Sequence, residues 1–120
     1  MSSDDFRKMH VWELAFKLLL QVYQITKNFP SNEKFCLVSD MRRAANSITH
    51  NIAEGYGRYE AKDKTRFYKI SRGSGYELIS QILVSEALKY INDSSVIDEL
   101  ININKEIIKE LNKIIKSLEN

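Results

Sequence analysis

Apolar residues recur along most of the chain at spacings of three and four, which is typical of helices with one buried side. The first such stretch runs from about Val11 to about Asn28. It ends at Phe29-Pro30, because the residue before a proline avoids helical geometry. The second stretch follows, with Ser31 or Asn32 expected as its N-cap. It ends near Gly55-Tyr56-Gly57, where we expect glycine to supply a left-handed cap.

The third stretch runs from about Ala61 to about Tyr90 and contains two interior glycines, Gly73 and Gly75. Each glycine costs on the order of 1 kcal/mol relative to alanine in a helix interior. We therefore expect another helix to approach closely there, with a ligand or partner backbone as the alternative. The residues predicted to face the core are Phe67, Ile70, Leu78, Ile82 and Leu88.

The fourth stretch begins after the turn Asn92–Ser95 and continues to near the end of the chain. Its apolar seam follows a strict alternation of three and four, typical of a heptad pattern: Ile97, Leu100, Asn104, Ile107, Leu111, Ile114 and Leu118. Three more isoleucines, Ile101, Ile108 and Ile115, widen the seam to a second side. Asn104 is either a tolerated polar position near the surface or a determinant of register or oligomeric state.

Short connections between four helices predict antiparallel neighbours and an all-α, up-down-up-down four-helix bundle. The 120 residues include one proline and four glycines, which are too few turn-forming residues for a β-sandwich. We expect one domain over residues 1–120, with a flexible or loosely packed segment over residues 1–9. The first and fourth helices are apolar on more sides than one core needs, which predicts self-association.

Further features of the sequence bear on the location of the protein in the cell and on its disulfide bonding. The first residues are polar and acidic, which argues against a signal peptide, and no apolar run approaches the roughly 20 residues of a membrane span. We therefore expect a cytoplasmic protein with no membrane partner. Cys36, the only cysteine, excludes an internal disulfide and is interpreted as a small core residue.

Charge is distributed unevenly although the net charge is only +2. The range from Asp40 to Arg72 contains eight positively charged side chains and four negatively charged ones. Opposite the core side of the second helix lies a polar stripe: Arg43, Ser47, His50, Asn51, Glu54 and Arg58. A solvated face is the default interpretation. The stripe nevertheless has no lysine, and arginine suits bidentate binding of carboxylate or phosphate.

The candidate site residues form two groups. For nucleic-acid or partner binding they are Arg42, Arg43, Asn51, Arg58, Lys62, Arg66, Lys69 and Arg72. For a structural polar network or interface they are Ser47, Glu54, Ser74, Glu77 and Asn104. Glu54 and Glu77 are expected to pair with arginines. Three tyrosines of the same region could stack on bases or serve in a protein interface: Tyr56, Tyr59 and Tyr68.

Catalytic chemistry finds little support in the sequence. His10 and His50 are far apart, and neither has a cysteine or carboxylate at metal-ligand spacing. No glycine-rich phosphate loop or serine-elbow motif is present. We therefore predict a protein that is not an enzyme, with no catalytic residue, metal or cofactor.

Two motifs resemble those of a known family. The block from Met41 to Ile48, followed by Asn51-Ile52-Ala53-Glu54-Gly55-Tyr56-Gly57-Arg58, resembles the signature of four-helix-bundle proteins encoded by intervening sequences of bacterial 23S rRNA genes. The block from Arg66 to Ser74, with Glu77-Leu78, resembles that family's second signature. The resemblance covers roughly residues 6–91.

The resemblance implies a bundle that self-associates, in known members as a ring of five. The family is also similar to accessory proteins of diversity-generating retroelements, whose basic bundle surface engages nucleic acid and a reverse transcriptase. Asn46 and Gly75 depart from the pattern, because a small and a larger apolar residue are usual at these positions.

Two functional hypotheses follow. In the first, a homo-oligomer, a pentamer by resemblance, binds RNA or DNA through its basic surface. In the second, the chain is a protein-interaction scaffold whose arginine stripe lies between subunits or holds a protein partner, without nucleic-acid binding.

Overall fold

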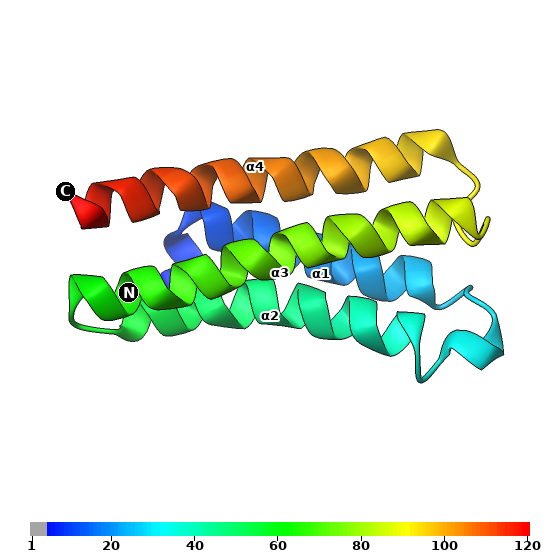
Figure 1. The fold of residues 1–120 in the computed structure, drawn as a ribbon, viewed down its shortest axis with the longest axis horizontal. Coiled ribbons are helices and arrows are strands. Elements are labelled where there is room, and N and C mark those ends of the chain that lie inside the picture. The colour runs from blue at the N-terminus through cyan, green and yellow to red at the C-terminus, as the bar shows by residue number, and fades with distance from the viewer. Residues whose placement is uncertain (1–4) are drawn as a thin grey trace.

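Four α-helices lie side by side along one long axis in the computed structural model, which describes residues 5–120 (Figure 1). They are α1 (His10–Thr26), α2 (Leu37–Gly57), α3 (Ala61–Ala87) and α4 (Ser94–Glu119). Short 3₁₀ turns, η1 (Phe6–Lys8) and η2 (Ser31–Glu33), precede α1 and α2. Residues 5–120 contain no strand, so the predicted all-α, four-helix class is confirmed.

The helices form a square in which each one packs against two others. α2 contacts α1 and α3, and α4 contacts the same two helices. Within residues 5–120, α1 and α3 do not contact each other, and neither do α2 and α4, so these pairs lie on the diagonals. Along α2 and α3, Arg43 meets Glu77 whereas Gly55 lies against Tyr68. These pairings are compatible with the predicted antiparallel order.

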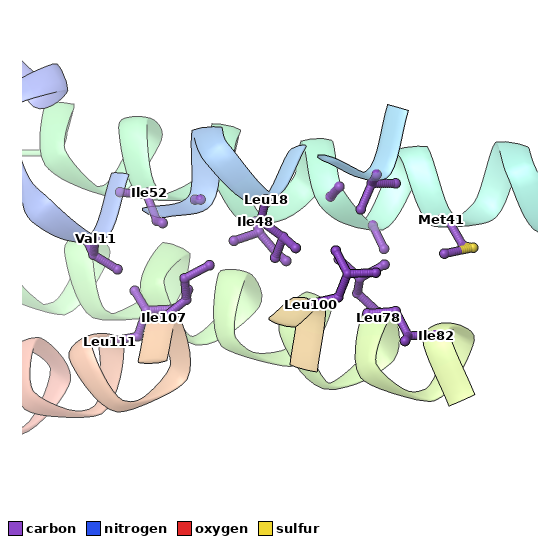
Figure 2. Close-up of a cluster of buried hydrophobic side chains, with 14 of the residues drawn as sticks. Val11, Leu18, Met41, Ile48, Ile52, Leu78, Ile82, Leu100, Ile107 and Leu111 are labelled. Atoms are coloured by element: carbon purple, nitrogen blue, oxygen red, sulfur yellow. The ribbon is translucent and has the colours of Figure 1, made fainter. Parts of the chain in front are cut away.

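The core runs along the axis of the square (Figure 2). Side chains from all four helices point into it, and full burial of one such side chain is worth roughly 1.5–3 kcal/mol. The largest apolar side chains that are completely buried are Leu18, Val22, Met41, Ile48, Ile52, Leu78, Ile82, Leu100, Ile107 and Leu111. The one-sided burial that the apolar spacing predicts for the first two helices is therefore confirmed in their central parts.

The predicted core face of α3 is only partly right. Leu78 and Ile82 are buried, but Ile70 and Leu88 are 43% and 50% exposed. Small side chains occupy the inner side instead, among them Ser71, whose Oγ donates to the Ile48 carbonyl oxygen at 2.8 Å. The predicted core face was wrong here because buried small residues resemble surface positions in a sequence. These small residues contact α2 and α4, and larger apolar residues lie on the outer side.

The glycines of α2 are helical, which corrects the predicted left-handed cap. No glycine in residues 5–120 has a positive φ, and α2 continues through Gly57. Gly55 is instead required by packing, because a Cβ there would lie 2.7 Å from Cε1 of Tyr68. Gly75 permits a close approach of α4, as expected, since a Cβ would lie 3.1 Å from Oδ1 of Asn104. Gly73 faces open space.

Two helix boundaries differ from the prediction. α2 begins at Leu37 and not directly after Ser31 or Asn32, because the 3₁₀ turn η2 intervenes. Cys36, in the connection, is exposed and not a core residue. α3 ends at Ala87, and the next turn places Lys89 in the left-handed region at φ 64°.

α4 buries more of its isoleucines than the heptad seam alone requires. The seam is buried from Ile97 to Leu111, but towards the C-terminus Ile108 and Ile115 take over, while Ile114 is half-buried. The second apolar side of α4 therefore contributes to this bundle's own core and does not remain for another subunit.

The N-terminal segment was expected to be flexible or loosely packed over residues 1–9. Residues 1–4 lie outside the described residues. Phe6 contacts Trp12 edge-on, with ring centroids 5.1 Å apart, and Met9 packs against the core.

Gly55→Ala and Gly57→Ala form a matched pair on one helix. We expect Gly55→Ala to lower the free energy of unfolding by about 1–3 kcal/mol, because its methyl group overlaps the buried Tyr68 ring. Gly57→Ala meets nothing within 4 Å and should raise it by up to about 1 kcal/mol. Urea denaturation measures both values, and equal stability of the two variants would contradict the packing role of Gly55.

Candidate functional site

The centre of the predicted stripe is a small polar network between α2 and α3. The hydroxyl groups of Ser47 and Ser74 lie 2.7 Å apart. Asn51 Nδ2 donates to Ser47 Oγ at 3.1 Å and to the Ser47 carbonyl oxygen at 2.8 Å. All three side chains are half-buried. The network therefore joins the two helices through side-chain hydrogen bonds.

Ion pairs lie on either side of this network. Arg43 Nη2 is 3.0 Å from Glu77 Oε2, and this hydrogen-bonded carboxylate raises the pKa of the Arg43 guanidinium above its ordinary value. Arg58 Nη2 is 3.1 Å from Glu54 Oε2, and its guanidinium lies over the Phe67 ring. Both arginines of the stripe thus have a carboxylate partner within the subunit, which offsets their charge.

Among the other predicted basic residues, Arg66 lies next to the stripe, because its guanidinium and that of Arg58 are both over the Phe67 ring. Arg42 instead turns towards α1, where Nε donates to Thr26 Oγ1 at 3.0 Å and the guanidinium lies over the Tyr23 ring. Lys62 is exposed and has no ion pair with any residue from 5 to 120.

Lys69 and Arg72 belong to the α3–α4 side of the bundle. Lys69 Nζ is 2.8 Å from Glu119 Oε2, and Arg72 Nη1 donates to Asn112 Oδ1 at 2.9 Å. The predicted single basic surface is therefore divided among the α1–α2, α2–α3 and α3–α4 sides.

Of the three tyrosines proposed to stack on bases, Tyr68 is set apart from the other two. Tyr68 is buried against Gly55, and burial raises the pKa of its hydroxyl group, so it is inaccessible as a stacking platform. Tyr59 is almost fully exposed in the α2–α3 connection. Tyr56, Tyr59 and Lys64 line a surface pocket of about 540 Å³, and Lys64 Nζ donates to the Tyr56 carbonyl oxygen at 2.8 Å.

Sequence reasoning missed a row of lysines on α4. Four of them line an open groove of about 550 Å³ between α3 and α4: Lys105, Lys109, Lys113 and Lys116. Counted along the chain, the last 29 residues carry more acidic than basic groups. The spacing of four, four and three is the signal that could have found them, because it gathers the lysines on one side of a helix.

Asn104 lies at the contact of α4 with α3 and is completely buried. Neither its Oδ1 nor its Nδ2 has a hydrogen-bond partner among the described side chains and backbone groups. The interpretation of Asn104 as a polar position near the surface is thus wrong. Its alternative role, as a determinant of register or assembly, stays a prediction.

The described residues contain no group of three or more His, Cys, Asp or Glu side chains suited to a metal ion. None of the helices in this part of the chain is long and apolar enough to cross a bilayer. The fold therefore defines a small protein of the four-helix, all-α class.

Over residues 7–113 the chain matches the family described as 23S rRNA-intervening sequence protein. The chain therefore belongs to this family, as its two motifs indicated. The comparison with curated proteins finds no match.

Asn104→Leu is expected to raise the free energy of unfolding by roughly 1–3 kcal/mol, because it removes two buried polar atoms that lack protein partners. The control is Asn102→Leu, two residues away at an exposed position, which should give no comparable gain. Urea denaturation distinguishes them. A loss of stability in Asn104→Leu would show that the amide group is satisfied in solution and contributes to the fold.

Proposed function

We propose that this chain is the protomer of a homo-oligomeric, non-enzymatic scaffold in the cytoplasm, built as an antiparallel up-down-up-down bundle. The observation that carries the proposal is a pair of exposed apolar surfaces on α1 and α3. Isolated exposed apolar side chains are common, but contiguous groups mark interaction sites.

The first surface, called the α1 face, consists of Phe16, Leu20 and Tyr23. These residues follow one another at spacings of four and three, so they share one side of the helix. Leu20 is 54% exposed, which leaves half of a large aliphatic side chain in water. The ring of Phe16 stacks on Trp12, with centroids 5.0 Å apart, and this contact extends the apolar surface towards the N-terminal end of α1.

The second surface, called the α3 face, follows the outer side of α3 between residues 70 and 88. Its exposed uncharged residues are Ile70, Gly73, Ser80, Leu83, Val84, Ala87 and Leu88. Tyr76, which lines the groove beside α4, lies at the margin of this face. Two acidic side chains of this range are also exposed, Glu86 and the Arg43-paired Glu77. A solvated helix side normally carries several charges, so the composition of the α3 face favours contact with another protein surface.

The positions of the two faces favour a head-to-tail assembly over a two-fold dimer. α1 and α3 lie on a diagonal of the square, so their outer sides point away from each other. A two-fold dimer through one face leaves the other face in water. A head-to-tail contact, with the α1 face of one copy on the α3 face of the next, covers both, and it forms a ring when the rotation between copies closes. A ring of five is the closed form that the resemblance implies.

Gly73 gives independent support for contact at the α3 face. No atom of the subunit lies within 4 Å of the Cβ position there, so packing within the bundle does not explain an interior glycine. Close approach of a second copy would explain it.

The arginine stripe favours the scaffold hypothesis over nucleic-acid binding at the same place. Arg43 and Arg58 are paired with Glu77 and Glu54, so a phosphate group would have to compete with a carboxylate at each position. The stripe lies beside the α3 face and is suited to the polar margin of a subunit or partner interface.

A mixing experiment tests the head-to-tail contact. Leu20→Glu places a charge in the α1 face, and Leu83→Glu places one in the α3 face. Each variant alone is expected to lose the ring, because each lacks one half of every contact. Mixed in equal amounts they should form a one-to-one complex, since each keeps the half that the other lacks. Light scattering after size exclusion measures these masses against the protomer mass of 14.0 kDa.

Asn102→Glu is the matched control, because it adds the same charge at an exposed polar position of α4. It should keep the wild-type mass. A wild-type protein that is monomeric at micromolar concentration, or a mixture that contains only monomers, would contradict the proposal.

A further inference from the structure

The α3–α4 groove combines a basic wall, an apolar floor and an exposed aromatic ring. Its wall is the row of four lysines on α4. Its floor is Ile108, which is buried where Gly75 allows α4 to approach α3. Tyr76 lies at the opposite edge and is 59% exposed. Asn112 also lines the groove and accepts a hydrogen bond from Arg72.

The positive charge in this groove is less compensated than that of the arginine stripe. No acidic side chain of residues 5–120 lines the groove. Within residues 5–120, Lys105, Lys109 and Lys116 form no ion pair, and Lys113 is 3.6 Å from the partly buried carboxylate of Glu110. Arg72 is hydrogen bonded to an amide group and not to a carboxylate. Most of these cations therefore remain accessible to an anionic partner.

The lysine row is long enough to follow several phosphate groups. Between Lys105 and Lys116 an α-helix rises by about 16 Å. At roughly 3.4 Å per stacked nucleotide, this length corresponds to about five nucleotides of one strand. Lysine suits such contacts, because its ammonium group is a point charge on a flexible stem and imposes no fixed geometry on a phosphate.

We propose that the α3–α4 groove is a binding site for a single-stranded polynucleotide, with its phosphate groups along the lysine row and a base stacked on Tyr76. Proteins that bind single strands without sequence preference combine a basic groove with exposed aromatic rings. An acidic peptide would use the lysines but, unlike a polynucleotide, does not carry a flat ring at every unit to stack on Tyr76. A rigid duplex keeps its bases stacked inside and could not use the ring.

Fluorescence anisotropy with labelled oligo-dT and oligo-U of about 16 nucleotides tests the site on the full chain. The variant Lys105→Gln/Lys109→Gln removes two charges at exposed positions. It should bind several-fold more weakly, and the slope of log affinity against log salt should fall by about 0.7 for each phosphate group that is no longer neutralised. The matched control is Lys17→Gln/Lys27→Gln, which removes two exposed charges from the α1 side and should bind like the wild type.

Tyr76 provides a second, non-electrostatic readout. Tyr76→Ala should weaken binding roughly 5- to 150-fold, the effect expected for one stacked base. Tyr76→Phe keeps the ring and should retain the affinity. Because Tyr76 lies at the margin of the α3 face, the mass of both variants is measured, and the lysine variant decides the outcome if Tyr76→Ala changes the assembly.

Several results would overturn the site. Among them are no binding to either oligonucleotide at low salt, equal weakening in the lysine variant and its control, and tighter binding of a duplex of the same length. Displacement of the oligonucleotide by poly-glutamate at equal charge concentration would assign the groove to an acidic polypeptide instead. Equal affinity for oligo-dT and oligo-U supports recognition through phosphate and base stacking alone, and preference for oligo-U supports RNA as the natural partner.

Discussion

Small residues on the inner side of α3, among them Ser71 and Gly75, set how both neighbouring helices pack against it. Gly75 admits Asn104 and Ile108 of α4, while Ser71 hydrogen bonds to the backbone of α2. Leu83 and its apolar neighbours lie on the outer side of the same helix, where they are exposed.

The small residues of α3 also explain which parts of the fold could be predicted. The helices and the core of α2 follow from periodicity, because large apolar residues such as Ile48 and Ile52 mark the buried side. In α3 the period is hidden, since the buried Ser71 and Ser85 are polar and the exposed Ile70 is apolar. The contacts of a serine with a neighbouring backbone are tertiary facts that a single sequence does not contain.

The site was predictable to a similar degree. Residues that share one helix side, such as Arg43 and Ser47, could be grouped from spacing alone. The partner helix could not, so the ion pair of Arg43 with Glu77 and the turn of Arg42 towards α1 needed the structure. Summing the charges along the chain also concealed the α4 lysines. Their acidic neighbours in sequence cancel them in such a sum, although these neighbours do not line the groove that the lysines share.

This small bundle of the 23S rRNA-intervening sequence family carries two apolar outer faces and one basic groove. Because the two helices that expose these faces are diagonal to each other, we propose that the protomer is incomplete alone. Sedimentation velocity over a range of protein concentrations tests this most directly. We expect one species of several times 14.0 kDa that persists at low micromolar concentration. A single species of 14.0 kDa throughout would contradict self-association.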